Sequence, residues 1–376
     1  MVDCSSIGML KILHTEAATT FGGQEHRIYK EMLAMRERGH YLEAVCQPGA
    51  HLITRLRDQG FVVHEVVMAG LKNYLPGVAK IQKIIRRGQF QIVNTHSRTD
   101  TVMAALAARL AGAPLIVRTR HLGKAPGSLL SYTILPHRVI AISQYVRSQL
   151  LGRGVSCEKM GLVYTAVAQP DAAVASSIRE ELGIPAEAVI IGSVGHMRIP
   201  KGHDKLIAAA LPIIKAMPNV HLVIAGRGEP LLSQLQAQVK EAKLERQIHL
   251  LGQRNDVPNL LSGFDIFALA TEAEALGTAY IEASSYGLPL VGTDIGGVPE
   301  IIEHGRNGFL FPLKDITALE ATLHCLVSNA QLRQEMGNNA KAMFEQDPRW
   351  KIEHMASETE AVYRKWLQER KRSVRK

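Results

Sequence analysis

The sequence lacks the features that mark several classes of protein. Its four cysteines form no C-x-x-C pair and have no histidine at metal-ligand spacing, so neither a disulfide framework nor a zinc site is predicted. Aromatic residues make up only 5% of the chain, too few among the charges for a nucleic-acid stacking surface. No signal-peptide pattern opens the sequence, and Arg109 interrupts the longest apolar run, residues 101–117. We therefore expect a cytoplasmic protein that neither crosses a membrane nor binds nucleic acid.

Two glycine motifs of nucleotide-binding proteins are also missing. The chain contains neither G-x-G-x-x-G nor G-x-x-x-x-G-K-[ST]. Dehydrogenase and P-loop kinase interpretations lose their main support.

The positive charge is unevenly distributed. The net charge is +9, but residues 364–376 hold seven basic groups against Glu369 alone, which accounts for +6 of it. Residues 77–88, GVAKIQKIIRRG, can form a helix with Val78, Ile81, Ile84 and Ile85 on one face and a cationic rim beside it. Such a helix either packs on its own domain in the ordinary way or rests on anionic lipid.

What the sequence does contain is alternation of short apolar runs with longer helical patterns, which is typical of parallel βαβ units. A length of 376 residues favours two domains. The pattern breaks at residues 163–177, where small, polar and proline-containing sequence suggests a linker. We predict an α/β fold of two doubly wound sheets, with ligand-binding loops at the carboxyl ends of the strands. The first eight residues are predicted to be an extension, because Met9 directly precedes the first strand-like run.

Three loops at strand ends could hold a phosphate. Gly22 and Gly23 precede a helix, where paired glycines permit close backbone approach and unusual φ values. Arg198 and Lys201 follow a strand, and two cations there suit a diphosphate. A third glycine-rich turn contains Gly296 and Gly297. Each signal taken alone is equally compatible with a tight turn or with solvated charges.

The stretch EALGTAYIE places two carboxylates seven residues apart. We expect Glu274 in a loop and Glu282 inside a helix that begins at Thr278. Backbone N–H groups of Leu276, Gly277 and Thr278 at that helix start could bind phosphate oxygens. A carboxylate in the second turn could accept both ribose hydroxyls. The alternative is an acid at a helix start and an unrelated surface residue.

Together these motifs closely resemble glycosyltransferase family 4, the retaining nucleotide-sugar-dependent enzymes with the GT-B fold. The resemblance rests on GGQEH, AISQYVRSQL, RIPKGHDKLIAAA, EALGTAYIEASSYGLPLVGTD and GGVPEIIEHGRNGFLF, and it covers nearly the whole chain. It implies two Rossmann-like domains with a cleft between them. The N-terminal acceptor-binding domain would span residues 1–166 and be completed by a helix over about residues 350–376. The nucleotide-sugar-binding domain would span residues 167–349.

The resemblance also implies roles for individual residues. Arg198 and Lys201 would bind the donor diphosphate, and Glu282 the ribose. Glu274 would face the transferred sugar and its phosphate, and His121 would lie near the reacting carbon of the sugar. The remaining donor-side residues it implies are Gly22, Gly23, Arg254, Ala275, Leu276, Gly277 and Thr278.

Three departures from the family pattern stand out. His196 replaces the usual arginine in GHMRIPKG, EALG replaces the frequent E-G-F-G, and VYTAV stands where N-G-V or N-G-I is usual. The second puts the packing of the sugar in question but leaves the backbone donors intact.

The predicted function is retaining transfer of a sugar from a UDP-, GDP- or ADP-linked donor to a lipid-linked or lipopolysaccharide-type acceptor at the inner membrane. No metal or other cofactor is predicted, because no paired carboxylates are placed for a bridging cation. Arg98, Arg118, Arg120 and Lys124 would suit a phosphorylated acceptor. Alternatives on the same fold are a nucleotide-sugar 2-epimerase, a transferase with a soluble product, and a non-enzymatic sugar-nucleotide-binding scaffold.

Overall fold

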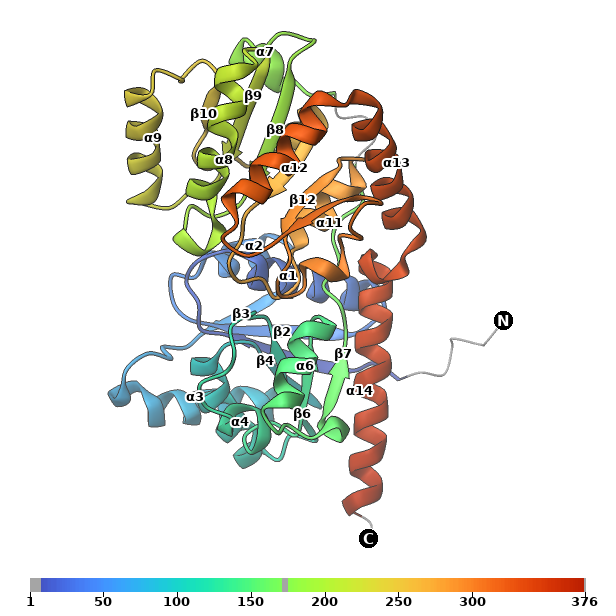
Figure 1. Ribbon diagram of the computed structural model, residues 1–376. Coiled ribbons are helices and arrows are strands. Elements are labelled where there is room, and N and C mark those ends of the chain that lie inside the picture. The colour runs from blue at the N-terminus through green and yellow to red at the C-terminus, as the bar shows by residue number, and fades with distance from the viewer. Residues whose placement is uncertain (1–7, 171–174, 375–376) are drawn as a thin grey trace. The chain divides into compact units, whose positions relative to one another are not determined.

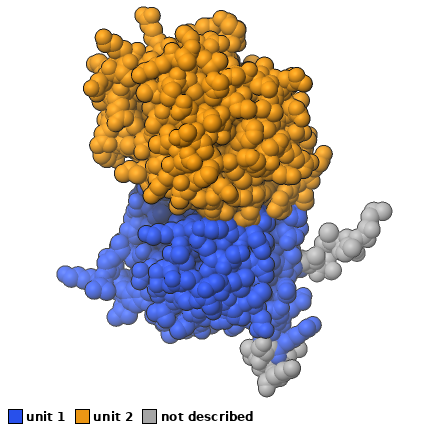
Figure 2. Space-filling model, viewed as in Figure 1, with its two compact units in different colours: residues 1–166, 351–376 blue, residues 167–350 orange. Residues whose placement is uncertain are grey.

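The computed structural model describes residues 8–170 and 175–374. The chain forms two compact units. Unit 1 comprises Met1–Ala166 and Lys351–Lys376, and unit 2 comprises Val167–Trp350, as coloured in Figure 2. The expected N-terminal extension lies, apart from Gly8, outside the described residues.

Unit 1 is built on a seven-stranded parallel sheet in the order β3-β2-β1-β4-β5-β6-β7. Its strands are β1 (Lys11–Glu16), β2 (Tyr41–Cys46), β3 (Val62–Glu65), β4 (Ile92–Thr95), β5 (Leu115–Arg120), β6 (Arg138–Ala141) and β7 (Met160–Leu162). Its α-helices are α1 (Gly23–Glu37), α2 (His51–Asp58), α3 (Tyr74–Gly88), α4 (Arg98–Ala111), α5 (Leu130–Thr133), α6 (Gln144–Gly152) and α14 (Ile352–Val374). Short 3-10 turns are η2 (Leu71–Asn73) and η3 (Cys157–Lys159).

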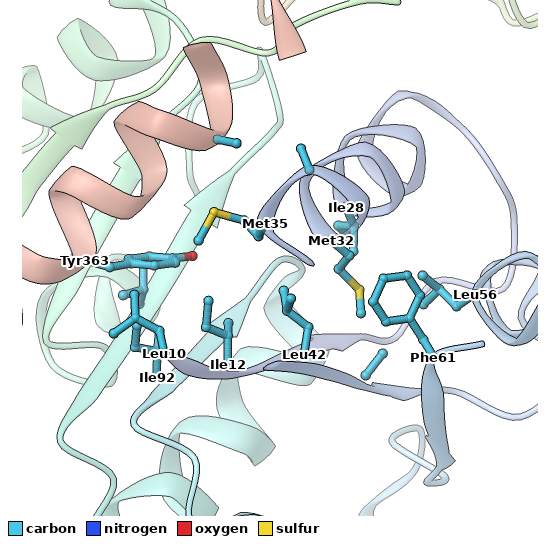
Figure 3. Close-up of a cluster of buried hydrophobic side chains, with 14 of the residues drawn as sticks. Leu10, Ile12, Ile28, Met32, Met35, Leu42, Leu56, Phe61, Ile92 and Tyr363 are labelled. Atoms are coloured by element: carbon cyan, nitrogen blue, oxygen red, sulfur yellow. The ribbon is translucent and has the colours of Figure 1, made fainter. Parts of the chain in front are cut away.

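Helix α14 packs on unit 1 through its apolar face, as Figure 3 shows. Tyr363 lies over Leu10, Ile12 and Ile92 from the sheet, with Met35 of α1 beside it. The buried hydroxyl of Tyr363 accepts a hydrogen bond from Asn94 Nδ2 at 2.8 Å. Burial of large side chains of this kind typically contributes about 1.5–3 kcal/mol each. The last helix is thus part of the core of the first unit.

The basic helix α3 uses its apolar residues within the protein. Val78, Ile81 and Ile85 are at most 4% exposed and share a core cluster with Met103 and neighbouring alanines of α4. Gly77 permits this contact, since a Cβ there would lie 2.4 Å from the sulfur of Met103. This apolar face therefore packs on its own domain and cannot rest on lipid.

Unit 2 is built on a six-stranded parallel sheet in the order β10-β9-β8-β11-β12-β13. Its strands are β8 (Val189–Val194), β9 (Val220–Ala225), β10 (Ile248–Leu250), β11 (Ile266–Leu269), β12 (Leu290–Thr293) and β13 (Gly308–Phe311). Its α-helices are α7 (Ile178–Leu182), α8 (His203–Ala216), α9 (Leu231–Glu241), α10 (Val257–Gly263), α11 (Thr278–Ser285), α12 (Ile316–Ser328) and α13 (Ala330–Gln346). The 3-10 turns are η4 (Ile199–Lys201), η5 (Val298–Glu300) and η6 (Pro348–Trp350).

Both sheets are parallel and twisted, with helices connecting successive strands, as Figure 1 shows. The strands are rich in buried aliphatic residues, which is what a parallel sheet covered by helices requires. The predicted α/β class with two doubly wound sheets is confirmed. Among the helices formed by the described residues, none is long and apolar enough to cross a bilayer.

Candidate functional site

In unit 2 the loop after β8 carries the two predicted cations. Arg198 is exposed, and Lys201, at the end of η4, is half-buried. Gly202 follows with φ +69°, and a Cβ there would lie 1.9 Å from the carbonyl oxygen of Ala270. Only glycine combines this conformation with so close an approach. The loop is thereby pressed against the end of β11.

The loop after β11 makes polar contacts with the loop after β8. The carbonyl oxygen of Pro200 accepts the N–H of Glu272 at 2.7 Å. Lys201 Nζ lies 2.6 Å from Glu274 Oε2, and these side chains are 29% and 15% exposed. The structure thus brings together two residues 73 positions apart that the sequence motifs singled out separately.

A glycine turn after β12 supports the Glu274 loop from behind. Gly296 has φ +60°, and a Cβ there would lie 2.1 Å from the carbonyl oxygen of Glu274. At Gly297 a Cβ would lie 2.5 Å from the carbonyl oxygen of Ala275, and its N–H donates to the Glu274 carbonyl at 3.2 Å. Because neither glycine has a Cβ, the turn after β12 can lie directly against the backbone of Glu274 and Ala275.

Helix α11 begins where the sequence predicts. Gly277 precedes it with φ +100°, and Ala275 and Leu276 are buried beneath the turn. Thr278 is the first helical residue, and Glu282 lies in the second turn, half-buried. The hydroxyl of Tyr280 donates to the Leu269 carbonyl at 2.6 Å, which ties the helix start to β11. Glu274 and Glu282 therefore occupy different elements, a loop and a helix.

Positive charge gathers around this edge of the sheet. Burial lowers the pKa of His196, and the cations Arg198, Arg227 and Lys201 lower it further. Arg227 lies in the loop after β9, and its carbonyl accepts the N–H of Met197 at 2.8 Å. The sequence analysis did not select Arg227, although its position between Gly226 and Gly228 after a strand was a usable signal.

Arg254 is engaged by two carboxylates. Its guanidinium donates to Glu181 at 2.5 and 2.9 Å and to Asp256 at 2.8 and 2.7 Å. The hydrogen bonds from Arg254 hold the pKa of Asp256 well below its usual range. The structure thus shows Arg254 fixing the turn after β10 against α7.

In unit 1 Gly22 and Gly23 lie at the start of α1, as expected, but not in an unusual conformation. Gly22 is extended, with φ −136°, and its N–H donates to Glu25 Oε2 at 2.7 Å. A Cβ at Gly23 would meet nothing within 4 Å. Neither glycine adopts the unusual φ values that glycine permits, because the turn is made by an extended residue and a capping glutamate.

His121, the first residue after β5, is half-buried and belongs to a row of three histidines. His121 Nε2 lies 3.0 Å from His96 Nδ1, and His96 Nε2 lies 2.9 Å from His14 Nδ1. Burial lowers the pKa of all three imidazoles. The sequence analysis missed His14, which lies inside β1 two residues before its end, and His96, whose only signal was its position directly after β4.

Buried acids and cations surround the histidine row. Asp100 is fully buried and accepts the hydroxyl of Thr15 at 2.7 Å and the N–H of His96 at 2.9 Å. Burial raises the pKa of Asp100 although these hydrogen bonds oppose the shift.

Two buried guanidiniums share one tyrosine nearby. Arg118 and Arg120 are 3% and 4% exposed, and both donate to the hydroxyl of Tyr132. Within residues 8–170 and 175–374 neither forms an ion pair. Of the four cations expected near an acceptor, these two are therefore buried, whereas Arg98 and Lys124 are exposed.

A groove of about 790 Å³ lies elsewhere in unit 1, at the end of the sheet where β1 and β2 begin. Four of its lining residues are cationic and come from α3 and the start of β1: Lys11, Lys80, Lys83 and Arg87. Its one acidic residue, Glu43, is paired with His64 at 2.5 Å. The groove therefore carries a net positive charge.

No group of three or more histidine, cysteine or acidic side chains in the described part of the chain is arranged to hold a metal ion.

Comparison with known proteins identifies two family models that together span most of the chain. The model described as "Glycosyltransferase Family 4" matches residues 21–168, and that described as "Glycosyl transferases group 1" matches residues 174–343.

Curated relatives include two bacterial enzymes. An N-acetyl-alpha-D-glucosaminyl L-malate synthase of Bacillus anthracis is 29% identical over 50% of this chain and 48% of its own length. A UDP-Gal:alpha-D-GlcNAc-diphosphoundecaprenol alpha-1,3-galactosyltransferase of Escherichia coli is 26% identical over 83% of this chain and 86% of its own length. The chain thus spans about half the length of the first relative and most of the second.

Solved structures share the fold. A glycosyltransferase from Rickettsia africae superimposes with a TM-score of 0.86 at 22% identity, over 96% of this chain and 99% of that chain. The Anabaena protein HepE in complex with UDP-glucose superimposes with a TM-score of 0.82 at 23% identity, over 94% and 99%.

Proposed function

Because the chain belongs to the glycosyltransferases of family 4 with the GT-B fold, we propose that it transfers a sugar from a nucleotide donor held by unit 2. The observation that carries the proposal is the meeting of Lys201, Glu274 and the start of α11 at one edge of the sheet. The Anabaena neighbour, which shares the fold, binds UDP-glucose.

The diphosphate is assigned to the cations and the helix start. Arg198 is exposed, and its loop is held against the end of β11 by the close approach of Gly202 to Ala270. Its guanidinium is therefore accessible and can bind two phosphate oxygens at once. Lys201 supplies a compact charge that Glu274 holds in position. Backbone N–H groups of Gly277 and Thr278, at the positive end of the α11 dipole, add uncharged donors.

The sugar and the ribose are assigned to the two acids of the motif. Glu274, with the backbone of Ala275 and Leu276, faces the transferred sugar, and Glu282 accepts the ribose hydroxyls. Arg254 contributes by holding the turn that flanks the base through its carboxylate contacts.

In this proposal catalysis is charge stabilisation of the departing diphosphate. Lys201 and Arg198 meet negative charge that grows as the sugar–phosphate bond breaks, in a site already oriented for it. The sugar is attacked from the face that the diphosphate leaves, and a diphosphate oxygen takes the acceptor proton, so configuration is retained and no metal is needed. An NMR spectrum of the first-formed product settles the anomeric configuration, and activity abolished by EDTA and restored by a divalent cation would contradict the metal-independent step.

Unit 1 is assigned to the acceptor side. His121 is proposed to contact the sugar or its acceptor, and the start of α1 at Gly22 and Gly23 to accommodate an anionic group. A lipid-linked or lipopolysaccharide-type acceptor is favoured by the name of the Escherichia coli relative, which includes a diphosphoundecaprenol-linked sugar.

Peripheral binding to an anionic membrane is proposed for the outer side of α3. Leu71 in η2 and Leu75 in the first turn of α3 are 96% and 72% exposed, and the same helix carries the cationic groove residues Lys83 and Arg87. Exposed leucines with a basic stripe suit an anionic lipid surface. Flotation with anionic vesicles at low salt should carry the protein, and a Leu71→Asp, Leu75→Asp variant should stay behind. Equal binding of both proteins would remove the assignment of this surface.

The donor class is tested by thermal shift against UDP-, GDP- and ADP-sugars. A true donor at about 100 times its Kd should stabilise the folded protein by about 2.7 kcal/mol. Radiolabelled sugar transfer then separates this enzyme from a binding scaffold, and formation of a free altered nucleotide sugar would favour the 2-epimerase alternative. A protein stabilised by none of the three donor classes would contradict the proposal.

A further inference from the structure

Three histidines form a hydrogen-bonded row across the carboxyl edge of the unit 1 sheet. His14 lies in β1, His96 follows β4, and His121 follows β5, and these three strands are neighbours in the sheet. The ring nitrogens are 2.9 and 3.0 Å apart, and the planes of the His14 and His96 rings are within 9° of parallel, with ring centroids 5.2 Å apart. At that separation the two rings lie edge to edge, as an N–H···N hydrogen bond requires. The row leads from the buried interior at His14 to the half-buried His121.

The backbone around the row is held in place. Asp100 accepts hydrogen bonds from Thr15, next to His14, and from the N–H of His96. It also accepts the N–H of Ser97 at 2.7 Å, as part of the capping box of α4. Because one carboxylate ties the ends of β1 and β4, the spacing between the first two imidazoles is set by the fold.

All three imidazoles are neutral at neutral pH. Burial lowers the pKa of His14 to about 3, and the guanidinium of Arg27 lowers it further. Loss of contact with water also holds the pKa of His96 and of the half-buried His121 well below its ordinary value, and the charges of Arg27 and Arg118 lower it further. A neutral imidazole has one N–H donor and one acceptor nitrogen. In each contact of the row, therefore, one ring donates its N–H and the other accepts with its bare nitrogen.

Two arrangements of protons satisfy both contacts. In the first, His14 Nδ1 donates to His96 Nε2, His96 Nδ1 donates to His121 Nε2, and His121 carries its proton on Nδ1. In the second every proton is reversed, and His14 carries its proton on Nε2. These tautomers are coupled, because a change at either end requires a change at the other.

The buried end of the row selects the first arrangement. His14 Nε2 is buried and has no hydrogen-bond partner among the residues that the structure describes. A bare acceptor nitrogen there is better tolerated than an orphaned N–H, which is rare in protein interiors.

We infer that His14 and His96 are positioning residues that hold His121 as the neutral Nδ1–H tautomer, so that it donates a hydrogen bond to an oxygen of the sugar or acceptor. This inference rests on the proposed function of His121. The outer Nδ1 makes no hydrogen bond within residues 8–170 and 175–374, so its proton is available to a substrate oxygen. A neutral donor there orients a hydroxyl without adding a charge that would oppose a developing cation on the sugar.

The test begins with the full-length protein labelled with ¹⁵N-histidine and free of substrate. A long-range ¹H–¹⁵N spectrum, assigned with single-histidine variants, should show His121 protonated on Nδ1 and unprotonated on Nε2. A spectrum that places the His121 proton on Nε2 would overturn the inference, whatever the activity of the protein.

Two nearly isosteric variants of His14 then test the coupling. His14→Leu removes the donor to His96, whereas the amide N–H of His14→Asn takes the place of Nδ1–H. We expect His14→Leu to mix the tautomers of His121 and to lower kcat about fivefold with little change in KM for the nucleotide sugar, the effect of losing one ordinary hydrogen bond. His14→Asn should restore both. Unchanged tautomer and kcat in His14→Leu would overturn the positioning role.

His40→Leu is the matched control. His40 is a buried histidine of unit 1 that accepts a hydrogen bond from Leu10 and contacts Glu360, outside the row. Its loss should lower stability without changing the tautomer of His121 or kcat. If His14→Leu fails to fold, the spectra of the wild type and of His14→Asn still show on which nitrogen His121 carries its proton. If no nucleotide sugar stabilises the wild type, the proposed function fails while the spectrum still reports the row.

Discussion

Units 1 and 2 share a doubly wound architecture, but different kinds of residue occupy the carboxyl edges of their sheets. In unit 2 the loops meet through glycines whose positions leave no room for a Cβ, such as Gly202 and Gly296, and the cations are half-buried or exposed. In unit 1 the corresponding edge is filled by buried titratable side chains, such as His14, Asp100 and Arg118. One edge consists of closely packed backbone with accessible cations, and the other of buried side chains behind the half-buried His121.

The difference follows from the chemistry each edge is proposed to perform. A diphosphate carries its own charge, so it is bound by close backbone N–H groups and cations that remain accessible. A hydroxyl is uncharged and is recognised by the geometry of its hydrogen bonds. A neutral imidazole whose tautomer is fixed can therefore bind it.

The largest effect is expected at the cation of unit 2. Lys201→Ala should lower kcat by on the order of 10² or more, because it removes a charge that stabilises the leaving diphosphate. Lys205→Ala is the control, since Lys205 lies one turn away and pairs with Glu272 at 2.6 Å. Initial rates of sugar transfer for the two variants check the prediction. Near-normal transfer by Lys201→Ala would remove Lys201 from the catalytic role.

The glycine contacts of unit 2 should matter for stability. Gly296→Ala forces a Cβ to within 2.1 Å of the Glu274 carbonyl, whereas Gly305→Ala, at a similar positive φ, meets nothing within 4 Å. We expect Gly296→Ala to reduce the free energy of unfolding by about 1–3 kcal/mol more than Gly305→Ala, as overpacking does. Urea denaturation of both variants measures the difference. Equal losses would show that conformation rather than close contact makes Gly296 necessary.

The histidine row of unit 1 should make stability depend on pH. The folded pKa of His14 is lowered to about 3 from an ordinary value of 6.5, so the unfolded chain binds the proton first as the pH falls. The stability associated with neutral His14 is fully present above about pH 6.5 and is lost between there and pH 3. Between pH 7 and pH 5 the wild type should lose about 2 kcal/mol more free energy of unfolding than His14→Asn. Parallel curves for the two proteins would contradict a buried neutral His14.

The smallest effects are expected at two buried tyrosines, one in each unit. Tyr132→Phe leaves Arg118 and Arg120 without a shared acceptor, and Tyr280→Phe removes one hydrogen bond, to the Leu269 carbonyl at 2.6 Å. We expect Tyr132→Phe to lower the free energy of unfolding by about 1–2 kcal/mol, because each buried guanidinium loses one acceptor but keeps another, and Tyr280→Phe by about 1 kcal/mol. Denaturant titrations compare them. A larger loss at Tyr280 would mean that the acceptors that remain, on Ser97, Thr101 and Lys124, satisfy the two guanidiniums.

Much of the fold could be predicted because parallel strands covered by helices are near-continuous apolar runs. Strands β1 to β6 correspond to the apolar runs LKILHT, YLEAVCQ, VVHEVV, FQIVNTH, PLIVRTRH and HRVIAIS. Strands β8 to β12 correspond to AVIIGSVG, VHLVIAG, QIHLLG, DIFALAT and LPLVGTD. Two of the four sheet-edge strands, β7 and β13, were less distinct in the sequence. β7 has only three residues, and β13 directly follows a glycine-containing turn. The edge strand β10 is equally short but lies within the apolar run QIHLLG.

The sequence by itself determined the two doubly wound sheets, the separation of Glu274 from Glu282, and the placement of Arg198 and Lys201 at a strand end, because these depend on local periodicity, capping and turn residues. Only the tertiary structure decided that Lys201 contacts Glu274, that the apolar face of α3 is buried against α4, and that His14, His96 and His121 form one row. These contacts join residues far apart in the chain. Their existence depends on the order of strands in the sheet and on which loops are pressed together, neither of which a local pattern contains.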